Sequence, residues 1–497
     1  MNHYLGIDIG TFESKGVIVD TSGRVVASAS KPHKMLVPQP GWAEHRPKQD
    51  WWGDFTFICK KMLADSGIAP NSIRAVGASA IGPCMLPVDE DGEALSNAAL
   101  YGVDTRAAKE IEELDATIGA ERILNRCGNA LTSQSVGPKI LWLKKNRPEI
   151  FRKAAKIVTS TTYLVQKLTG QCVIDHYSAA NFSPLYLIDQ QGWSTELAPG
   201  IIETERLPKI MWTTGIAGHV TARAARATGL AKGTPVIAGT IDAAAEALSV
   251  GVVRTGDMMV MYGSTIFTIM LSKDRIEDAR LWYAPWLFPG EHASMAGLAT
   301  SGTLTHWFRD QAARDLAPDE AFAKLAREAE ASPPGANGLV MLPYFSGERT
   351  PIHDPDAKGT IFGLNLTHSR GDLYRALLEG IACGTNHIIE TYRDIGHMPR
   401  SLLAVGGGTK NRVWSQAVSD ISAMAQTVRR KTIGASYGDA FLAALGVGDV
   451  RKRDILGWNP EERRIVPQPR HRGIYDRQYR IFKELYARNR DLMAELT

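Results

Sequence analysis

The first hydrophobic pattern of the chain predicts a strand, a turn and a second strand. Between residues 5 and 10, apolar residues alternate with Gly or Asp, and this period of two is typical of a β-strand. Residues 17–19 are β-branched and predict the partner strand. The expected turn, residues 10–16, begins and ends with glycine, which lets the backbone bend and approach a ligand closely.

The same pattern returns in the second half of the chain. Residues 257–261 are apolar, residues 263–265 form a small hydroxyl-rich turn, and residues 266–271 are again rich in β-formers. Strand and helix patterns alternate elsewhere, which predicts an α/β protein. The repeated hairpin suggests two related domains that face each other, and we expect them to span residues 1–246 and 247–497.

Size and charge agree with a two-domain globular protein. A chain of 497 residues is too long for a single core. Its 44% apolar and 22% charged residues are ordinary proportions for a globular protein. The net charge is only +4 and no long basic run accompanies it, so we expect no nucleic-acid partner.

Sequence features also predict a cytoplasmic protein without a membrane segment. The N-terminus enters a strand without a basic and apolar leader, and no apolar run reaches the roughly 18 residues of a membrane span. The five cysteines are scattered and form no CxxC pair, which favours reduced thiols and argues against a zinc site.

Phosphate binding, if present, would depend on the two turns, because the chain lacks GxxxxGK[ST] and a convincing GxGxxG. Thr11 and Ser14 offer hydroxyls, and Lys15 a cation, suited to phosphate oxygens. Asp8 on the incoming strand could hold Mg²⁺ through water. With residues 263–265 opposite, two closing bodies could clamp a triphosphate and exclude water. The alternatives are a hairpin with an exposed acid and a purely structural second turn.

A glycine run between a strand and a helix is a second candidate. Residues 406–408 follow the apolar strand 402–405, and Asn411 is a plausible N-cap for the helix that follows. Without side chains, this backbone could lie against a flat base or ribose. The alternative is a crowded strand-to-helix turn.

Two acidic positions admit both a structural and a chemical interpretation. Asp242 stands after a buried strand and opens an Ala-rich helix, so it either suits the helix dipole or accepts a proton from a substrate hydroxyl. Asp104 and Arg106 project to the same side of a strand. They form either a surface ion pair, which their spacing favours, or a site for polyol hydroxyls.

Residues 359–379 resemble the long C-terminal signature of the FGGY carbohydrate kinases. Residues 139–146 fit part of the shorter N-terminal signature, but the residues just before Lys139 do not. Further landmarks follow in family order from residue 4 to about residue 447, nearly the whole chain. The matching signature positions are Gly359, Ile361, Gly363, Leu364, Asp372, Leu373, Ala376, Leu377, Leu378 and Glu379.

The resemblance implies an actin-like (RNase H-like) ATPase fold of two α/β domains, with a nucleotide and sugar cleft between them. It implies phosphorylation of a sugar or polyol hydroxyl by ATP with Mg²⁺. Asp242 would be the catalytic base, and Asp8, with Asp242, would serve the metal. The residues implied to contact the nucleotide or its phosphates are Thr11, Ser14, Lys15, Gly263, Ser264, Thr265, Gly302, Gly407, Gly408 and Asn411.

The substrate is expected to be a pentulose such as xylulose, because the layout is most similar to the xylulokinases of the family. Their substrate loop has a GQMHG-like run, whereas residues 80–84 here read Ala-Ile-Gly-Pro-Cys, so the amide and imidazole contacts are missing. Pro83 and Cys84 would then line the sugar site. Asp104 and Arg106 match a W-x-D-x-R-like substrate position, although Gly102 replaces the tryptophan.

Other functions stay open at this stage. A kinase of an erythritol-like or glycerol-like polyol, or of a hydroxyketone, would share the same motifs. A catalytically weak sugar- or ATP-binding regulator is a second alternative, against which the presence of both Asp8 and Asp242 argues. A homodimer is retained as an expectation for the oligomeric state.

Overall fold

The computed structural model describes residues 2–496, which form two compact units, each assembled from several stretches of the chain. Unit 1 contains the residues up to Val253 together with Lys273–Ala293 and Ile433–Asn459. Unit 2 contains Arg254–Ser272, Ser294–Thr432 and the residues from Pro460 onward. The boundary expected at residue 246 falls within helix α9 (Asp242–Ser249), and as a domain boundary it stays a prediction.

Unit 1 is built on a seven-stranded sheet with the order β13-β14-β5-β1-β2-β3, with β15 also beside β5. Strand β1 (His3–Ile9) pairs antiparallel with β2 (Glu13–Asp20) and parallel with β5 (Ile73–Ala80). The other strands of the sheet are β3 (Val25–Pro32), β13 (Ile216–His219), β14 (Pro235–Ile237) and β15 (Thr240–Ile241).

The first turn is shorter than the sequence predicts. Strand β2 begins at Glu13, so only residues 10–12 lie between the strands, and the expected turn over residues 10–16 is wrong in its second half. Lys15 is paired with Asp8, and Ser14 with Ile9, in the antiparallel ladder. Because neighbouring side chains of a strand point to opposite faces, Ser14 and Lys15 cannot serve the same ligand from this strand.

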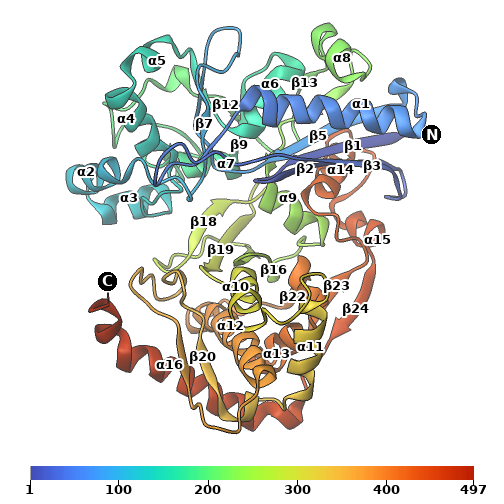
Figure 1. Cartoon of the computed structure of the whole chain (residues 1–497). Helices are drawn as coiled ribbons and strands as arrows, with labels where there is room; N and C mark the ends of the chain where they lie inside the picture. Colours follow the sequence, from blue (N-terminus) through green and yellow to red (C-terminus); the bar gives the residue numbers. More distant parts are fainter. Residues whose placement is uncertain (1, 497) are drawn as a thin grey trace. The chain divides into compact units, whose positions relative to one another are not determined.

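Two helices cover the opposite faces of this sheet (Figure 1). Helix α1 (Asp54–Ser66) packs against the face that carries Ile7, Ile9 and Ile18. Helix α14 (Ala435–Gly446) packs against β1 and β5 on the other face. The remaining elements of unit 1 are β4 (Glu44–His45), β6 (Leu86–Val88), β7 (Ala98–Ala99), α2 (Ala108–Ile118), α3 (Ala120–Cys127), α4 (Val136–Asn146), α5 (Pro148–Lys153), β8 (Lys156–Val158), α6 (Ser160–Thr169), β9 (Val173–Asp175), α7 (His176–Ala179), β10 (Tyr186–Leu187), β11 (Gly192–Trp193), β12 (Lys209–Met211), α8 (Ala222–Thr228), β18 (Trp282–Pro285) and α15 (Ile455–Trp458).

Helix α14 approaches the sheet so closely that only glycine fits beneath it. A Cβ atom at Gly6 would lie 2.0 Å from the carbonyl oxygen of Ser436, and one at Gly77 would lie 2.2 Å from that of Asp439. Both distances are far inside van der Waals contact. The backbone of α14 therefore packs directly on β1 and β5.

Unit 2 repeats the arrangement of strands found in unit 1. Strand β16 (Asp257–Tyr262) pairs antiparallel with β17 (Ile266–Ser272) and parallel with β22 (Ser401–Val405), just as β1 pairs with β2 and β5. The strand order is β19-β17-β16-β22-β23-β24, which confirms the predicted second hairpin. The other elements of this unit are β19 (His292–Leu298), α10 (Gly302–Ala312), α11 (Ala321–Ala331), β20 (Val340–Leu342), β21 (Thr360–Phe362), α12 (Arg370–Asp394), α13 (Arg412–Ser422), β23 (Gln426–Arg429), β24 (Glu461–Ile465) and α16 (Arg472–Ala494).

The two longest helices, α12 and α16, belong to unit 2. Helix α12 has 25 residues and begins with a capping box in which Ser369 and Asp372 satisfy each other's backbone N–H groups. Helix α16 has 23 residues. Within residues 2–496, every helix is too short or too polar to cross a lipid bilayer.

We predict that Gly77→Ala lowers the free energy of unfolding by about 1–3 kcal/mol, the usual effect of overpacking a core. The new methyl group would collide with the backbone of α14, which cannot rotate away as a side chain can. Urea denaturation measures the change. Gly457→Ala is the control, because a Cβ atom there meets no atom within 4 Å. Equal stability of the two variants would contradict the prediction.

Candidate active site

Four carboxylates gather on the α14 face of the sheet in unit 1. Asp8 is near the end of β1, directly beside Ser79 of β5 in the parallel register. Strand β15 pairs with the end of β5, so Asp242, the first residue of α9, opens its helix at the same edge. Glu246 follows one turn later on α9, and Asp439 comes from α14. The predicted pair Asp8 and Asp242 is therefore part of a larger acidic group.

Burial and mutual repulsion make these carboxylates hard to ionise. Burial raises the pKa of Asp242 to about 7, with a further contribution from the charge of Glu246. Burial also raises the pKa of Glu246 to about 7. The pKa of Asp8 lies well above its usual range, because the charges of Asp242 and Glu246 add to the effect of burial. The group is thus suited to accept positive charge or protons.

The charge of Lys15 acts on this acidic group and also on Glu13. Its charge lowers the pKa of Asp8 and of Glu246, but its ammonium also lies 3.2 Å from Glu13. Across residues 2–496, no three His, Cys, Asp or Glu side chains are placed to ligate one metal ion directly. Mg²⁺ commonly uses only one or two carboxylates and takes its other ligands from water and phosphates. These residues fit such an ion.

Thr11 and Ser14, predicted in the first phosphate turn, lie in different environments. The Thr11 hydroxyl is 3.2 Å from the Tyr101 hydroxyl, and the Thr11 carbonyl oxygen is 3.0 Å from Nε2 of His45. Ser14 is buried, and its hydroxyl donates to Asp54 at 2.9 Å on the α1 face. Ser14 is therefore not brought together with Asp8 and Lys15.

Asp104 and Arg106 form a buried ion pair. Nη2 of Arg106 lies 2.7 Å from Asp104 and 2.9 Å from Glu44. The guanidinium stacks on Trp42, with its central carbon 4.0 Å from the ring centre. Asp104 also accepts a hydrogen bond from the backbone N–H of Ala43 at 2.8 Å. These polar groups are already occupied within the protein. The predicted ion pair is therefore present, but its expected place on the surface is wrong, because both side chains are buried.

Pro83 and Cys84 of the predicted substrate loop are buried. The Cys84 thiol lies 3.4 Å from the carbonyl oxygen of Ile81 and can donate a weak hydrogen bond to it. Burial raises the pKa of this thiol to about 12, so it stays neutral. Cys84 is consequently a small packing group and a weak donor.

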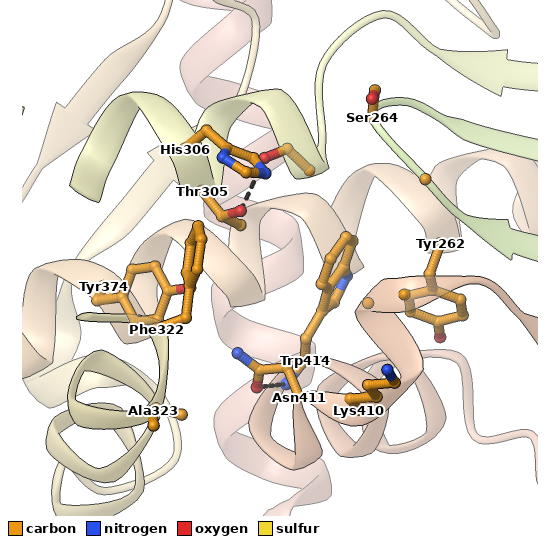
Figure 2. A pocket seen from close by; sticks show the side chains of 15 residues that line it. Tyr262, Ser264, Thr305, His306, Phe322, Ala323, Tyr374, Lys410, Asn411 and Trp414 are labelled. Atoms are coloured by element: carbon orange, nitrogen blue, oxygen red, sulfur yellow. Dashed lines mark hydrogen bonds between the residues drawn. The ribbon is translucent and has the colours of Figure 1, made fainter. Parts of the chain in front are cut away.

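Unit 2 contains a cavity of about 530 Å³, within the size range of small-molecule sites. Figure 2 shows aromatic side chains around it, with Tyr262 and Trp414 on one side and Phe322 and Tyr374 on the other. The Asn411 side chain caps α13 by accepting from the N–H of Trp414 at 3.1 Å, which confirms the predicted cap. The cavity brings together six predicted residues: Gly263, Ser264, Gly302, Gly407, Gly408 and Asn411.

The Gly263–Ser264 turn is held by the start of helix α10. The carbonyl oxygen of Gly263 accepts from the Gly302 N–H at 3.0 Å, and that of Ser264 accepts from the Thr303 N–H at 3.1 Å. A Cβ atom at Gly302 would lie 2.4 Å from the Gly263 carbonyl oxygen. The absence of a side chain at Gly302 therefore lets the start of α10 pack closely against the turn. Thr265 is not among the residues that line the cavity.

Sequence reasoning missed several residues of both sites. In unit 1, two residues could have been found from the sequence. Glu246 lies one helical turn after Asp242, and Asp439 is the single acid in a helix of mostly apolar residues. In unit 2, the aromatic residues that line the cavity have no sequence spacing that would identify them as ligand contacts. Their members are Tyr262, Phe322, Tyr374 and Trp414.

Family models match both parts of the chain. The N-terminal domain model of the FGGY family of carbohydrate kinases matches residues 3–249, and its C-terminal domain model matches residues 258–447. The chain belongs to the FGGY family of carbohydrate kinases. It is a phosphotransferase with an alcohol group as acceptor and ATP as co-substrate, and it has the two-domain actin-like fold of the family.

The similarity to individual FGGY kinases extends along the whole chain. The crystal structure of xylulose kinase from Rhodospirillum rubrum is 32% identical, superposes with a TM-score of 0.92, and covers 99% of this chain and 100% of its own. Xylulose kinase of Escherichia coli (strain K12) is 29% identical over 99% of this chain and 100% of its own. A gluconokinase of Bacillus licheniformis is 26% identical over 92% of this chain and 90% of its own.

We predict that Glu246→Gln raises the melting temperature at pH 8 by a few degrees in EDTA, and much less at pH 5. Folding raises the pKa of Glu246 from its ordinary value of 4.5 to about 7, so the wild-type side chain stabilises the fold fully only below pH 4.5. That stabilisation is lost as the pH rises through 7, whereas glutamine does not titrate. Differential scanning fluorimetry from pH 5 to pH 8 measures it, with exposed Glu112→Gln as the control. A difference independent of pH would contradict the prediction.

We predict that Gly407→Ala raises the KM for ATP about tenfold, since a steric cost of about 1.4 kcal/mol is one decade in affinity. A Cβ atom at Gly407 meets no protein atom within 4 Å, so the methyl group enters the cavity and leaves the melting temperature unchanged. Gly408→Ala instead places its Cβ 2.4 Å from the Trp414 ring and should lower the melting temperature. An unchanged KM in Gly407→Ala would show that the nucleotide avoids this backbone.

Proposed function

We propose that this FGGY kinase transfers the γ-phosphoryl group of ATP to a hydroxyl of a pentulose such as xylulose. Support comes from relatives named xylulose kinase, which align with this chain over their whole length. The observation that carries the chemistry is the grouping of Asp8, Asp242 and Glu246 at one edge of the unit 1 sheet. Polyols and other small hydroxylated compounds are the alternative acceptors.

Asp242 is the proposed catalytic base. It would take the proton of the attacking substrate hydroxyl as that oxygen bonds to the γ-phosphorus. Its pKa of about 7 is matched to this task, because a base with a pKa near the working pH is both available and strong enough. Its place at the first residue of α9 favours the ionised form.

Asp8, with Asp242, is proposed to serve Mg²⁺. When bound, the ion neutralises charge on the phosphate oxygens in the transition state. Asp8 suits this role because its carboxylate is surrounded by other acids and is stabilised by added positive charge. Lys15, paired with Asp8 across the ladder, would add a fixed positive charge toward the phosphates.

The nucleotide is proposed to bind in the cavity of unit 2. Gly407 and Gly408 would lie against the ribose or base, and the aromatic rings would pack on the base. Gly263, Ser264 and Thr265 would hold the terminal phosphates with backbone and hydroxyl donors.

The acceptor site is proposed to include the loop with Pro83 and Cys84. A thiol and a proline ring lack the donors of an amide or imidazole, so this loop would act mainly by its shape. Asp104 and Arg106, satisfied by each other and by Glu44, would stabilise the segment that carries Tyr101. Their contribution to sugar binding would therefore be indirect.

The cysteines support a proposal for the cellular setting. Five free cysteines fit the cytoplasm, where thiols stay reduced and ATP is available. The partners proposed are ATP and a small-molecule substrate. The homodimer stays a prediction, which light scattering coupled to size-exclusion chromatography would test.

We predict that ADP release rises above the ATP-only background with a pentulose, and that Asp242→Asn lowers kcat at least about 10²-fold, the usual effect of losing a general base. An amide cannot accept the proton. A coupled assay with pentuloses, tetritols, glycerol and hexuloses measures both. If no compound exceeds the background, the kinase proposal fails, and full activity in Asp242→Asn would refute only the base. Asp20→Asn, at the last residue of β2 and opposite His3 rather than Asp8, is the control.

A further inference from the structure

Asp439 is an acid enclosed by the fold with no role in the chemistry described so far. It lies in helix α14, whose other residues from 435 to 446 are apolar or small, apart from Ser436 and Tyr437. Its exposed fraction is 0%, and its Oδ1 atom is buried without a hydrogen-bond partner. A polar group in such a place normally costs stability, so its presence calls for a physical reason.

The backbone of α14 is fixed where it carries Asp439. The carbonyl oxygen of Asp439 sits over Gly77 of β5, at the 2.2 Å Cβ distance given above. Gly77 is two residues before Ser79 on the same face of that strand. The close contact between helix and sheet at Gly77 thus places the side chain of Asp439 beside Ser79.

Ser79 connects Asp439 with Asp8. The Ser79 hydroxyl oxygen lies 2.7 Å from Oδ2 of Asp439 and 3.2 Å from Oδ1 of Asp8. A serine hydroxyl has one proton and can donate only one of these bonds. Two ionised carboxylates would therefore leave one of them facing a lone pair of Ser79 without a proton between the oxygens.

A proton on Asp439 resolves this conflict. No Lys, Arg or His forms an ion pair with Asp439 in the part of the chain that the structure describes, so only hydrogen bonds from Ser79 offset a buried negative charge there. Burial, together with the neighbouring charge of Asp8, raises the pKa of Asp439 well above its usual range. The proton belongs on Oδ2, since on Oδ1 it would be a buried donor without an acceptor.

We propose that Asp439 is a positioning residue that acts on Asp8 through a hydrogen-bond relay. The Oδ2–H group of Asp439 donates to Ser79, and the Ser79 hydroxyl donates to Oδ1 of Asp8. The relay fixes the rotation of the Asp8 carboxylate and satisfies one of its oxygens. Such outer partners of a metal-associated carboxylate set its orientation and its affinity for the ion. This inference rests on the proposed role of Asp8 toward Mg²⁺.

The relay differs from a second possibility, in which an ionised Asp439 itself serves a cation. The two are separated by the chemistry of asparagine. The amide of Asp439→Asn has nearly the shape of the acid and can donate to Ser79, but it carries no charge. A relay survives this change, whereas a charged ligand is lost.

Three variants test the relay: Asp439→Ala, Asp439→Asn and Ser79→Ala. For each we would measure kcat, the KM values for ATP and sugar, and Mn²⁺ binding in the presence of ADP by electron paramagnetic resonance. Asp439→Ala and Ser79→Ala should each lower kcat and Mn²⁺ affinity about 10- to 100-fold, the usual cost of losing an outer partner. The KM for sugar should stay unchanged, and Asp439→Asn should recover most of both losses. The double variant should be no worse than the more impaired single variant, because both changes break one relay.

Several results would overturn the relay. Wild-type kcat and Mn²⁺ affinity in Ser79→Ala or in Asp439→Ala would do so, as would an Asp439→Asn variant as impaired as Asp439→Ala. If Asp439→Ala does not fold, Ser79→Ala and Asp439→Asn still decide the question. Asp20→Ala, another buried acid of unit 1, controls for lost stability and should change only the melting temperature. Asp8→Asn separates the two proposals, because full activity and Mn²⁺ binding there would refute the role of Asp8 itself.

Discussion

The contact between helix α14 and the sheet at Gly6 and Gly77 is the constraint on which the unit 1 site depends. Because glycine removes the side chains there, the backbone of α14 reaches the strands that carry Asp8 and Ser79. Asp439 is thereby brought into an acidic group that the strands and α9 would otherwise form alone. The tight packing limits motion of the carboxylates, and pre-organised charge is what phosphoryl transfer requires of a protein.

One arrangement of strands supports two different chemistries in this kinase. In unit 1, the hairpin β1–β2 and its parallel neighbour β5 present acids and one lysine. In unit 2, the corresponding strands β16, β17 and β22 end in glycine-rich turns beside an aromatic cavity. The shared framework fixes where each turn lies, and the residues at the turns distinguish the roles proposed for the two units, which are proton transfer and metal binding in unit 1 and nucleotide binding in unit 2.

Local sequence predicted the parts of the site that depend on local order. The positions of Asp242 at a strand-to-helix junction and of Asn411 as a helix cap could be predicted, because the neighbouring residues determine the backbone conformation at each. Ser14 was predicted in a turn, but strand β2 starts at Glu13, four residues before the expected residue 17. Ser14 therefore lies within the strand, and its side chain points to the α1 face, away from Asp8 and Lys15. Asp439 was not recognised because its neighbours, Ser79 and Asp8, are hundreds of residues distant and only the fold joins them.

The return of residues 433–459 to unit 1 affects how the enzyme is made. Helix α14 covers the sheet that begins at residue 3, yet the ribosome synthesises it after the unit 2 segments Arg254–Ser272 and Ser294–Thr432. Until α14 is synthesised, Gly6 and Gly77 stay uncovered. Unit 1 therefore cannot complete its folding during synthesis before these segments of unit 2 have been made. A chain that stops short of this helix would lack Asp439 and would leave Gly6 and Gly77 uncovered, so the proposed acidic group of unit 1 would be incomplete.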